Sequence, residues 1–123
     1  MKICITAQGD QLTAEMDPRF GRCQYFLIVD TKSGDCEAVA NPYLEGTGGV
    51  GVQAGQLMAE KKVEVVLTGQ IGPNAFGTLQ AGGIQVITGL TGKVSEALEK
   101  FKRGGLKPDQ GPSASSKSGM RGF

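Results

Sequence analysis

Short apolar runs rich in β-branched residues alternate along the first hundred residues with segments whose apolar positions recur at helical spacing. Most of these segments are separated by Gly, Pro, Asn or Asp, the residues that favour turns. The pattern predicts strands at residues 2–7, 25–30, 36–40, 63–68 and 84–87, and helices at residues 50–61, 73–81 and 94–102. Such alternation is typical of an α/β domain.

The order of these elements predicts how the sheet is connected. The strands at 25–30 and 36–40 flank a short turn at 31–35, so they should form an antiparallel hairpin. The later strands are joined through helices, which requires parallel pairing and right-handed crossovers. We therefore expect a single α/β domain with a five-stranded mixed sheet, an antiparallel hairpin plus parallel strands, flanked by three helices.

The composition of the chain changes at residue 103. Acidic side chains outnumber basic ones in residues 1–102, whereas residues 103–123 are rich in Gly, Pro and Ser and carry mostly basic charges. The second segment has too few apolar residues to form a packed core. We expect residues 1–102 to form the α/β domain and residues 103–123 to form a disordered basic tail, either a solvated terminus or a tether to an acidic surface.

The expected strand directions bring four connections to one edge of the sheet. These connections are the segments 8–23, 41–49, 69–73 and 88–93. Open α/β sheets bind ligands beyond the carboxyl ends of their parallel strands, because the chain diverges there and leaves a cleft. We therefore predict that the ligand site lies at this edge.

The chemistry of this edge favours an anion. Three expected helices begin after glycines, at 48–51, 72–73 and 89–92, and each start presents unpaired backbone N–H groups and the positive end of the helix dipole. Arg19 and Arg22 add two guanidinium groups suited to anions. Alternatively, an arginine forms an ion pair with Asp17 or Glu15 and only pins the loop. Each interpretation can hold for a different arginine.

Three cysteines and one methionine are the candidate soft ligands. Cys23 directly follows the arginines, where a lowered thiolate pKa is expected, so it is the candidate metal ligand. Cys4 lies inside the first strand and is expected to be a buried small hydrophobic residue. Cys36 lies in the hairpin, away from the predicted site. Met16 offers a thioether, although gap-filling packing is its more frequent role.

Composition excludes several function classes. The absence of histidine removes Ser-His and Cys-His nucleophile systems and the most frequent metal-binding nitrogen. The formal net charge of +1 gives no reason to expect nucleic-acid binding. Three widely spaced cysteines favour the reducing cytoplasm, and no apolar run approaches the roughly 20 residues of a membrane helix. An enzyme acting on a phosphorylated metabolite is disfavoured, because the carboxylates show no paired pattern and the glycines do not match a Walker A loop.

Several short motifs occur together and in order along the chain. They are DPRFGR at 17–22, Phe26 with IVD at 28–30, NP at 41–42, GGVG at 48–51, LTG at 67–69 with GPNAF at 72–76, AGGI at 81–84, and Glu96-Ala97 before Phe101. Through these motifs the sequence resembles the dinitrogenase iron-molybdenum cofactor biosynthesis family of the NifX type, over about residues 2–106.

The resemblance implies a ribonuclease-H-like fold and a protein that binds, stores or delivers an anionic metal–sulfur cluster without catalysis. The cluster would contain molybdenum with iron, as in nitrogen-fixation cofactor precursors, or with copper, as in orange-protein-like members. The absence of histidine favours the second branch. Charge, shape and apolar walls would hold the cluster, at the cofactor-binding candidates Arg19, Phe20, Gly21, Arg22, Gly48, Gly49, Gly51, Gly69, Ile71, Gly72 and Pro73.

The expected partners are proteins that donate or accept the cluster, and the chain is expected to be a monomer or weak dimer with no nucleic-acid or membrane partner. An alternative from a different class is a small regulatory or scaffold module. Such a module would use the same crevice to bind a protein partner or a simple anion.

Overall fold

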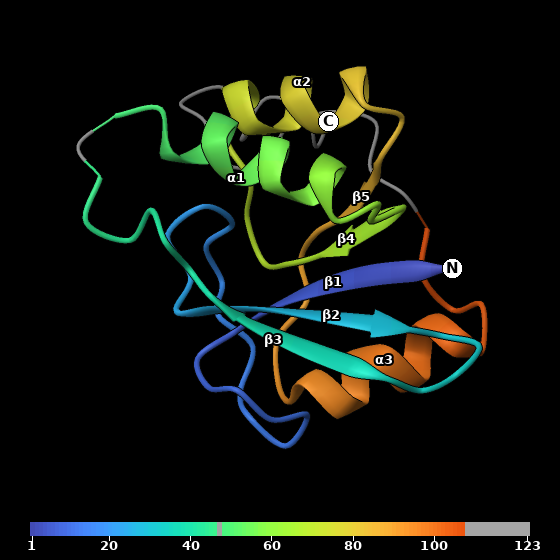
Figure 1. The fold of residues 1–123 in the computed structure, drawn as a ribbon. Helices are drawn as coiled ribbons and strands as arrows, with labels where there is room; N and C mark the ends of the chain where they lie inside the picture. Colours follow the sequence, from blue (N-terminus) through green and yellow to red (C-terminus); the bar gives the residue numbers. More distant parts are fainter. Residues whose placement is uncertain (47, 108–123) are drawn as a thin grey trace.

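A five-stranded mixed sheet forms the centre of the computed structural model, which describes residues 1–46 and 48–107 (Figure 1). The strand order is β3-β2-β1-β4-β5. The elements are β1 (Lys2–Ala7), β2 (Tyr25–Asp30), β3 (Cys36–Ala40), α1 (Val50–Glu60), β4 (Val65–Leu67), α2 (Pro73–Ala81), β5 (Gln85–Ile87) and α3 (Val94–Lys102).

The predicted connectivity of the sheet is confirmed. β1 pairs antiparallel with β2 and parallel with β4, β2 pairs antiparallel with β3, and β4 pairs parallel with β5. β4 is shorter than expected, but its flanks still bond across the sheet: the Glu64 amide donates to the Lys2 carbonyl over 2.8 Å, and the Thr68 amide donates to the Ile87 carbonyl over 3.0 Å. The single α/β domain with three helices is therefore as predicted.

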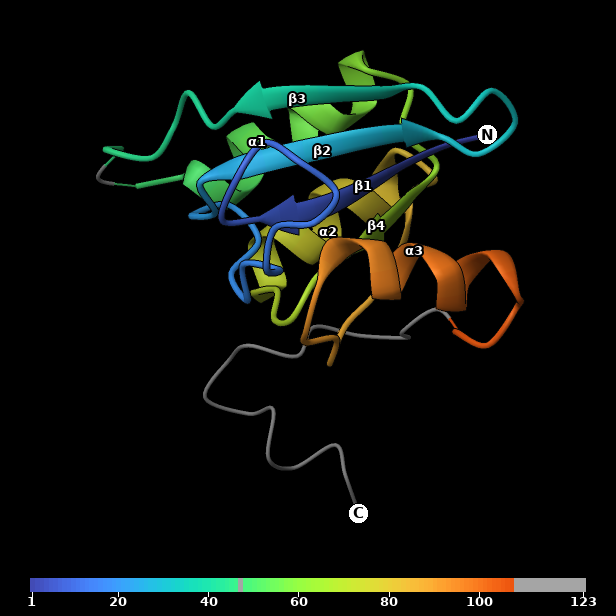
Figure 2. The ribbon, with the colours of Figure 1, turned by 90° about the horizontal axis from the view of Figure 1, so that it is seen from below.

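The helices form two layers around the sheet. α1 and α2 cover one face and α3 covers the other (Figures 1 and 2). Side chains alternate between the faces of a strand, so Cys4 packs in the cluster under α1 and α2, whereas Ile3 and Ile5 pack in the cluster under α3. Because β1 is buried on both faces, its apolar run is nearly continuous.

The domain continues past the end of α3. Leu106 is half-buried against the cluster under α3, although the sequence analysis assigned it to the tail. The rest of the expected tail, residues 108–123, lies outside the described residues. Among the helices that the structure describes, none is long and apolar enough to cross a membrane.

Two helical glycines predict opposite effects of the same substitution. A Cβ atom at Gly77 in α2 would meet nothing within 4 Å, whereas one at Gly55 in α1 would lie 2.8 Å from Cγ2 of Thr78. We expect Gly77→Ala to raise the free energy of unfolding by about 0.5–1 kcal/mol, because alanine loses less backbone entropy on folding. Gly55→Ala should lower it by about 1 kcal/mol or more, because the α1–α2 contact is overpacked.

Urea unfolding of the two single variants measures both effects. Equal changes in the two variants would contradict this account of α1 and α2 packing.

Candidate functional site

The candidate site lies where the parallel strands end and β2 begins, at the edge of the sheet opposite the N-terminus (Figure 1). The segment 17–24 is the last part of the long connection between β1 and β2. We call this segment the arginine loop, since it carries Arg19 and Arg22.

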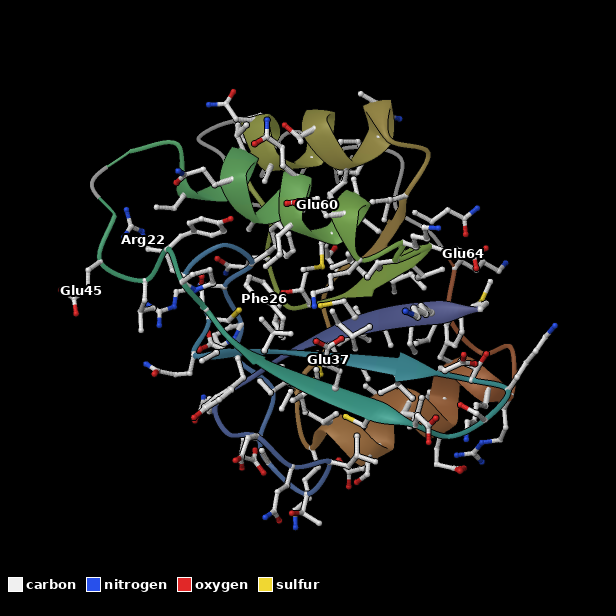
Figure 3. All side chains as sticks on the ribbon, viewed as in Figure 1. Arg22, Phe26, Glu37, Glu45, Glu60 and Glu64 are labelled. Carbon is white, nitrogen blue, oxygen red and sulfur yellow. The ribbon has the colours of Figure 1, made fainter. Side chains whose placement is uncertain are left out.

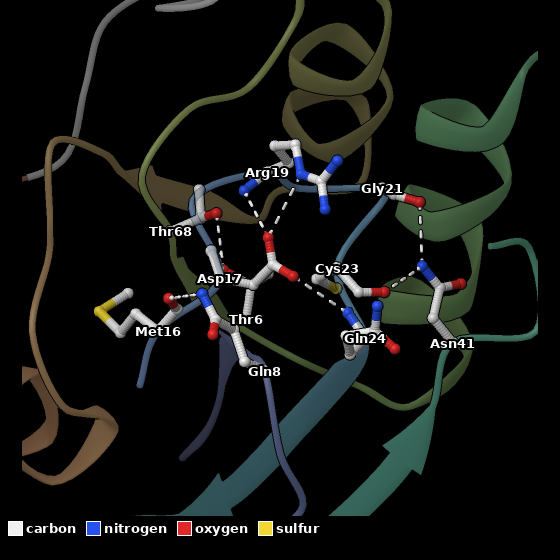
Figure 4. Close-up of polar contacts among 10 residues, drawn as sticks. All are labelled: Thr6, Gln8, Met16, Asp17, Arg19, Gly21, Cys23, Gln24, Asn41 and Thr68. Atoms are coloured by element: carbon white, nitrogen blue, oxygen red, sulfur yellow. Dashed lines mark hydrogen bonds and ion pairs between the residues drawn. The ribbon is translucent and has the colours of Figure 1, made fainter. Parts of the chain in front are cut away.

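A buried carboxylate organises the arginine loop. Asp17 is only 2% exposed, and its two carboxylate oxygens accept the backbone amides of Arg19 at 3.1 Å and Gln24 at 3.2 Å (Figure 4). Nε of Arg19 lies 3.5 Å from the same carboxylate. These contacts bring both ends of the loop to one side chain.

The two arginines differ in what holds them. Arg19 forms the ion pair with Asp17 that was one of the two interpretations, yet its side chain remains 58% exposed, so it can still meet a ligand. Arg22 donates from Nη1 to the carbonyl of Gly46 over 3.2 Å. Both arginines therefore lie at the surface of the site, Arg22 beside the chain that follows β3 (Figure 3).

Asp17, at the start of the loop, is hydrogen-bonded to Thr6 of β1, and Thr6 is in turn bonded to Thr68, which follows β4. Asp17 donates its amide to the carbonyl of Thr6 over 2.9 Å, and its own carbonyl accepts the Thr6 hydroxyl over 2.7 Å. The Thr6 and Thr68 hydroxyl oxygens lie 2.8 Å apart. Since the Thr6 proton already goes to Asp17, Thr68 must be the donor in this second bond.

The middle of the loop packs against the turn after β4. The backbone amide of Gln70 donates to the Pro18 carbonyl over 2.6 Å, and the backbone amide of Phe20 donates to the Gln70 carbonyl over 3.1 Å. A Cβ atom at Gly69 would lie 2.8 Å from Pro18 backbone atoms, so this approach requires glycine. The Phe20 ring is buried beside Phe26, with centroids 5.9 Å apart, and anchors the loop in the core.

Small residues bring the loop against the starts of two helices. Gly21, at φ 97°, lies so close to Gly51 of α1 that a Cβ atom would be 3.2 Å from the Gly51 Cα. A Cβ atom at Gly51 would in turn lie 2.9 Å from Cβ of Ala75 in α2. The arginine loop and the starts of α1 and α2 therefore converge, as predicted for the sheet edge.

The α1 and α2 starts remain suited to an anion. Their N-cap residues, Gly49 and Gly72, make no side-chain cap, and neither helix has an acidic residue in its first turn. Unpaired amides and the helix dipole both favour negative charge at such a start.

The start of α3 does not fit the prediction of an anion site. The Glu96 carboxylate accepts the Lys93 amide over 3.1 Å. The next two amides, of Val94 and Ser95, donate to carbonyls of the first long connection at 2.9 Å each. Because these donors are occupied and Glu96 carries negative charge, the start of α3 does not suit an anion.

Two expected apolar walls are part of the core instead. Phe20 is 7% exposed and Ile71 is 1% exposed, so neither presents much surface to a ligand. By contrast, Gly48, Gly49 and Pro73 are exposed. Gly51, Gly69 and Gly72 are partly exposed, and Gly21 is buried. The large apolar members of the predicted site hold the loop from below.

The prediction for Cys23 is wrong, because this thiol is buried rather than activated. Burial raises its pKa to about 12, and the Asp17 carboxylate adds to the rise, outweighing the effect of Arg19. Burial also raises the pKa of Cys4, which is 0% exposed as expected. Met16, at 5% exposure, packs in the core. Within residues 1–46 and 48–107, no group of three or more His, Cys, Asp or Glu side chains could hold a metal ion.

Thiol labelling checks this assignment. We expect Ellman's reagent to modify one thiol per folded chain rapidly at pH 8, since Cys36 is exposed and Cys4 and Cys23 are buried. The Cys36→Ser variant should show no rapid labelling until denaturant is added. Rapid labelling of Cys23 in that folded variant would contradict its burial.

A shallow pocket of about 460 Å³ opens beside Asp17, lined by Gln8, Asp17, Pro18, Arg19 and Gln24. Neither glutamine was expected at the site, and Asp17 was expected there only as an ion-pair partner. Gln24 lies two residues after the motif at 17–22 and reaches the pocket because the folded loop brings its amide to Asp17. Its spacing in the sequence does not predict this position.

Residues 1–104 match the protein family described as dinitrogenase iron-molybdenum cofactor. The apo form of the orange protein from Desulfovibrio gigas has a similar structure, with a TM-score of 0.89 and 37% sequence identity over 92% of this chain and 96% of that one. A Thermotoga protein solved by NMR and provisionally described as NifB has a TM-score of 0.75 and 36% identity over 87% of this chain and 91% of its own. An uncharacterized protein of Methanocaldococcus jannaschii is 31% identical over 110 residues, 87% of this chain and 90% of its own. The chain therefore belongs to the dinitrogenase iron-molybdenum cofactor family.

Proposed function

We propose that this protein binds an anionic metal–sulfur cluster at the arginine loop and stores or delivers it without catalysis. The observation that carries the proposal is the convergence of Arg19 and Arg22 with the acid-free starts of α1 and α2. Positive charge from side chains and from two helix dipoles acts at one place, which suits a bulky anion.

The cluster is held by charge and hydrogen bonds rather than by a thiolate. Cys23 is the cysteine nearest the arginines in sequence, but it is buried and its raised pKa keeps it protonated at neutral pH. Guanidinium and backbone N–H groups can donate to the terminal sulfur or oxygen atoms of a cluster. Such a site can release its cargo without breaking a metal–protein bond.

The family description, which names an iron-molybdenum cofactor, supports a cluster that contains molybdenum. Iron or copper would be the second metal, as the sequence resemblance implies, and the 37% identity to the orange protein favours the orange-protein-like type. Proteins that supply or accept the cluster would be the partners of this chain.

Reconstitution without oxygen tests the proposal. The purified full chain is mixed with tetrathiomolybdate and Cu(I), or with an iron-sulfide source, desalted, and examined by elemental analysis and visible absorption. We expect stoichiometric metal and charge-transfer bands from one of the two mixtures. Molybdate alone is the control, because it has the charge of tetrathiomolybdate but no sulfide.

Colourless protein free of metal after both mixtures would overturn the proposal. That result would favour the regulatory or scaffold alternative, and the search would then turn to protein partners.

A further inference from the structure

We propose that Asn41 is a positioning residue for Arg22, as Asp17 is for Arg19. This inference rests on the proposed function, because Arg22 matters only if the loop binds an anion. Asn41 directly follows β3 and is 8% exposed, one of four buried polar or charged residues in the described chain.

The side chain of Asn41 makes three hydrogen bonds. Its Nδ2 donates to the carbonyls of Gly21 over 3.0 Å and Cys23 over 2.9 Å, and its Oδ1 accepts the Tyr43 amide over 2.9 Å. Only this orientation of the amide places donors against the two carbonyls and an acceptor against the N–H group. The side chain is therefore fully engaged in a single orientation.

The two carbonyls that Asn41 holds belong to the residues on either side of Arg22 (Figure 4). Fixing the backbone before and after Arg22 fixes the direction in which its side chain leaves the loop. The same chain segment then supplies the carbonyl of Gly46, which accepts Nη1 of Arg22 over 3.2 Å. Segment 41–46 thus holds both the backbone around Arg22 and its guanidinium group.

Arg19 is held by a different set of contacts. Its backbone amide and its Nε both face Asp17, at 3.1 Å and 3.5 Å. Asp17 is bonded to Thr6 of β1, and its Oδ2 accepts the Gln24 amide, which belongs to the same peptide group as the Cys23 carbonyl that Asn41 holds. The loop therefore has two clamps, one for each arginine, and they meet at the peptide group between Cys23 and Gln24.

A double-mutant cycle separates positioning from a general structural role. Asn41→Ser shortens the side chain, so its hydroxyl can still accept the Tyr43 amide in a local turn but no longer reaches the two carbonyls. We expect it to weaken binding of tetrathiomolybdate about fivefold to tenfold in the wild-type chain and in Arg19→Ala. In Arg22→Ala it should cause no further loss, since the group that it positions is already absent.

Equal losses in the Arg19→Ala and Arg22→Ala backgrounds would overturn the proposal, and so would no loss in any background. Ile3→Val, in the core under α3, is the control for lowered stability and should leave the affinity unchanged. If Asn41→Ser fails to fold, Asn41→Thr replaces it, because threonine also keeps an acceptor for the Tyr43 amide, does not reach the two carbonyls and adds no charge.

A second readout does not require binding, so it distinguishes failure of this inference from failure of the proposed function. In ¹H–¹⁵N spectra of the ligand-free chain, Asn41→Ser should shift the Nε–H signal of Arg22 more than that of Arg19. An unchanged Arg22 signal would overturn the positioning role even if the wild-type chain binds no thiomolybdate.

Discussion

Replacing both Arg19 and Arg22 by alanine is expected to weaken tetrathiomolybdate binding about a hundredfold. Each guanidinium supplies charge-assisted hydrogen bonds, and for partly exposed side chains we expect about a tenfold loss per arginine. Isothermal titration calorimetry without oxygen measures the affinity. The loss should shrink as salt is added, because the interaction is largely electrostatic.

A second pair of cationic side chains, at the end of α3, controls for the change in net charge. Lys100, in the last turn of α3, and Arg103, at its C-cap, are exposed. This end of α3 lies away from the arginine loop (Figure 2). The Lys100→Ala/Arg103→Ala variant removes the same charge and should bind almost as tightly as the wild type. A similar loss in both double variants would show that binding is nonspecific and would contradict the proposed site.

Asp17→Ala is expected to lower the free energy of unfolding by about 3 kcal/mol. The substitution leaves the amides of Arg19 and Gln24 without their acceptor and removes the partner of the Arg19 guanidinium. Losing a buried, hydrogen-bonded charge typically costs this much, because the groups left behind are not rehydrated. Chemical unfolding followed by circular dichroism measures the change.

Asp30→Ala is the matched control for Asp17→Ala. Asp30 also accepts two backbone amides, from Lys32 and Ser33, and the Lys32 amide is the main cause of its lowered pKa. It lies at the surface, where water can replace the lost acceptor, so we expect a much smaller change in stability. An equal effect of the two substitutions would contradict the role of burial at Asp17.

The elements of the fold could be predicted because their signals are local. Five β-branched apolar runs and three helical segments appear in the sequence, and the structure places an element at each. Their connectivity followed from chain length and handedness, since two strands joined through a helix must run parallel. The more specific ribonuclease-H-like label stays a prediction.

The candidate site could be predicted only in outline. The arginines and the glycines before α1 and α2 were found because charged side chains and glycines are visible in the sequence. The closed start of α3 was missed because its amides bond to carbonyls of Leu12 and Ala14, about eighty residues earlier in the chain.

Cys23 shows most directly that neighbouring residues in the sequence do not determine the pKa of a thiol. Its position after Arg22 indicated a reactive thiolate, but the folded chain buries it and places the Asp17 carboxylate near it, and both raise its pKa. A pKa depends on solvation and on charges in space, which adjacent residues alone do not determine.

Sequence alone therefore determined the strands, the helices, the directions of the strands and the edge at which the arginines lie, because hydrophobic period and chain connectivity are properties of the chain itself. Only the tertiary structure decided the order of the strands, which carboxylate holds Arg19, which side-chain amide holds the backbone around Arg22, and which helix start is closed by other parts of the chain. Those outcomes depend on hydrogen bonds and burial between residues that are distant in sequence and meet only when the sheet has formed.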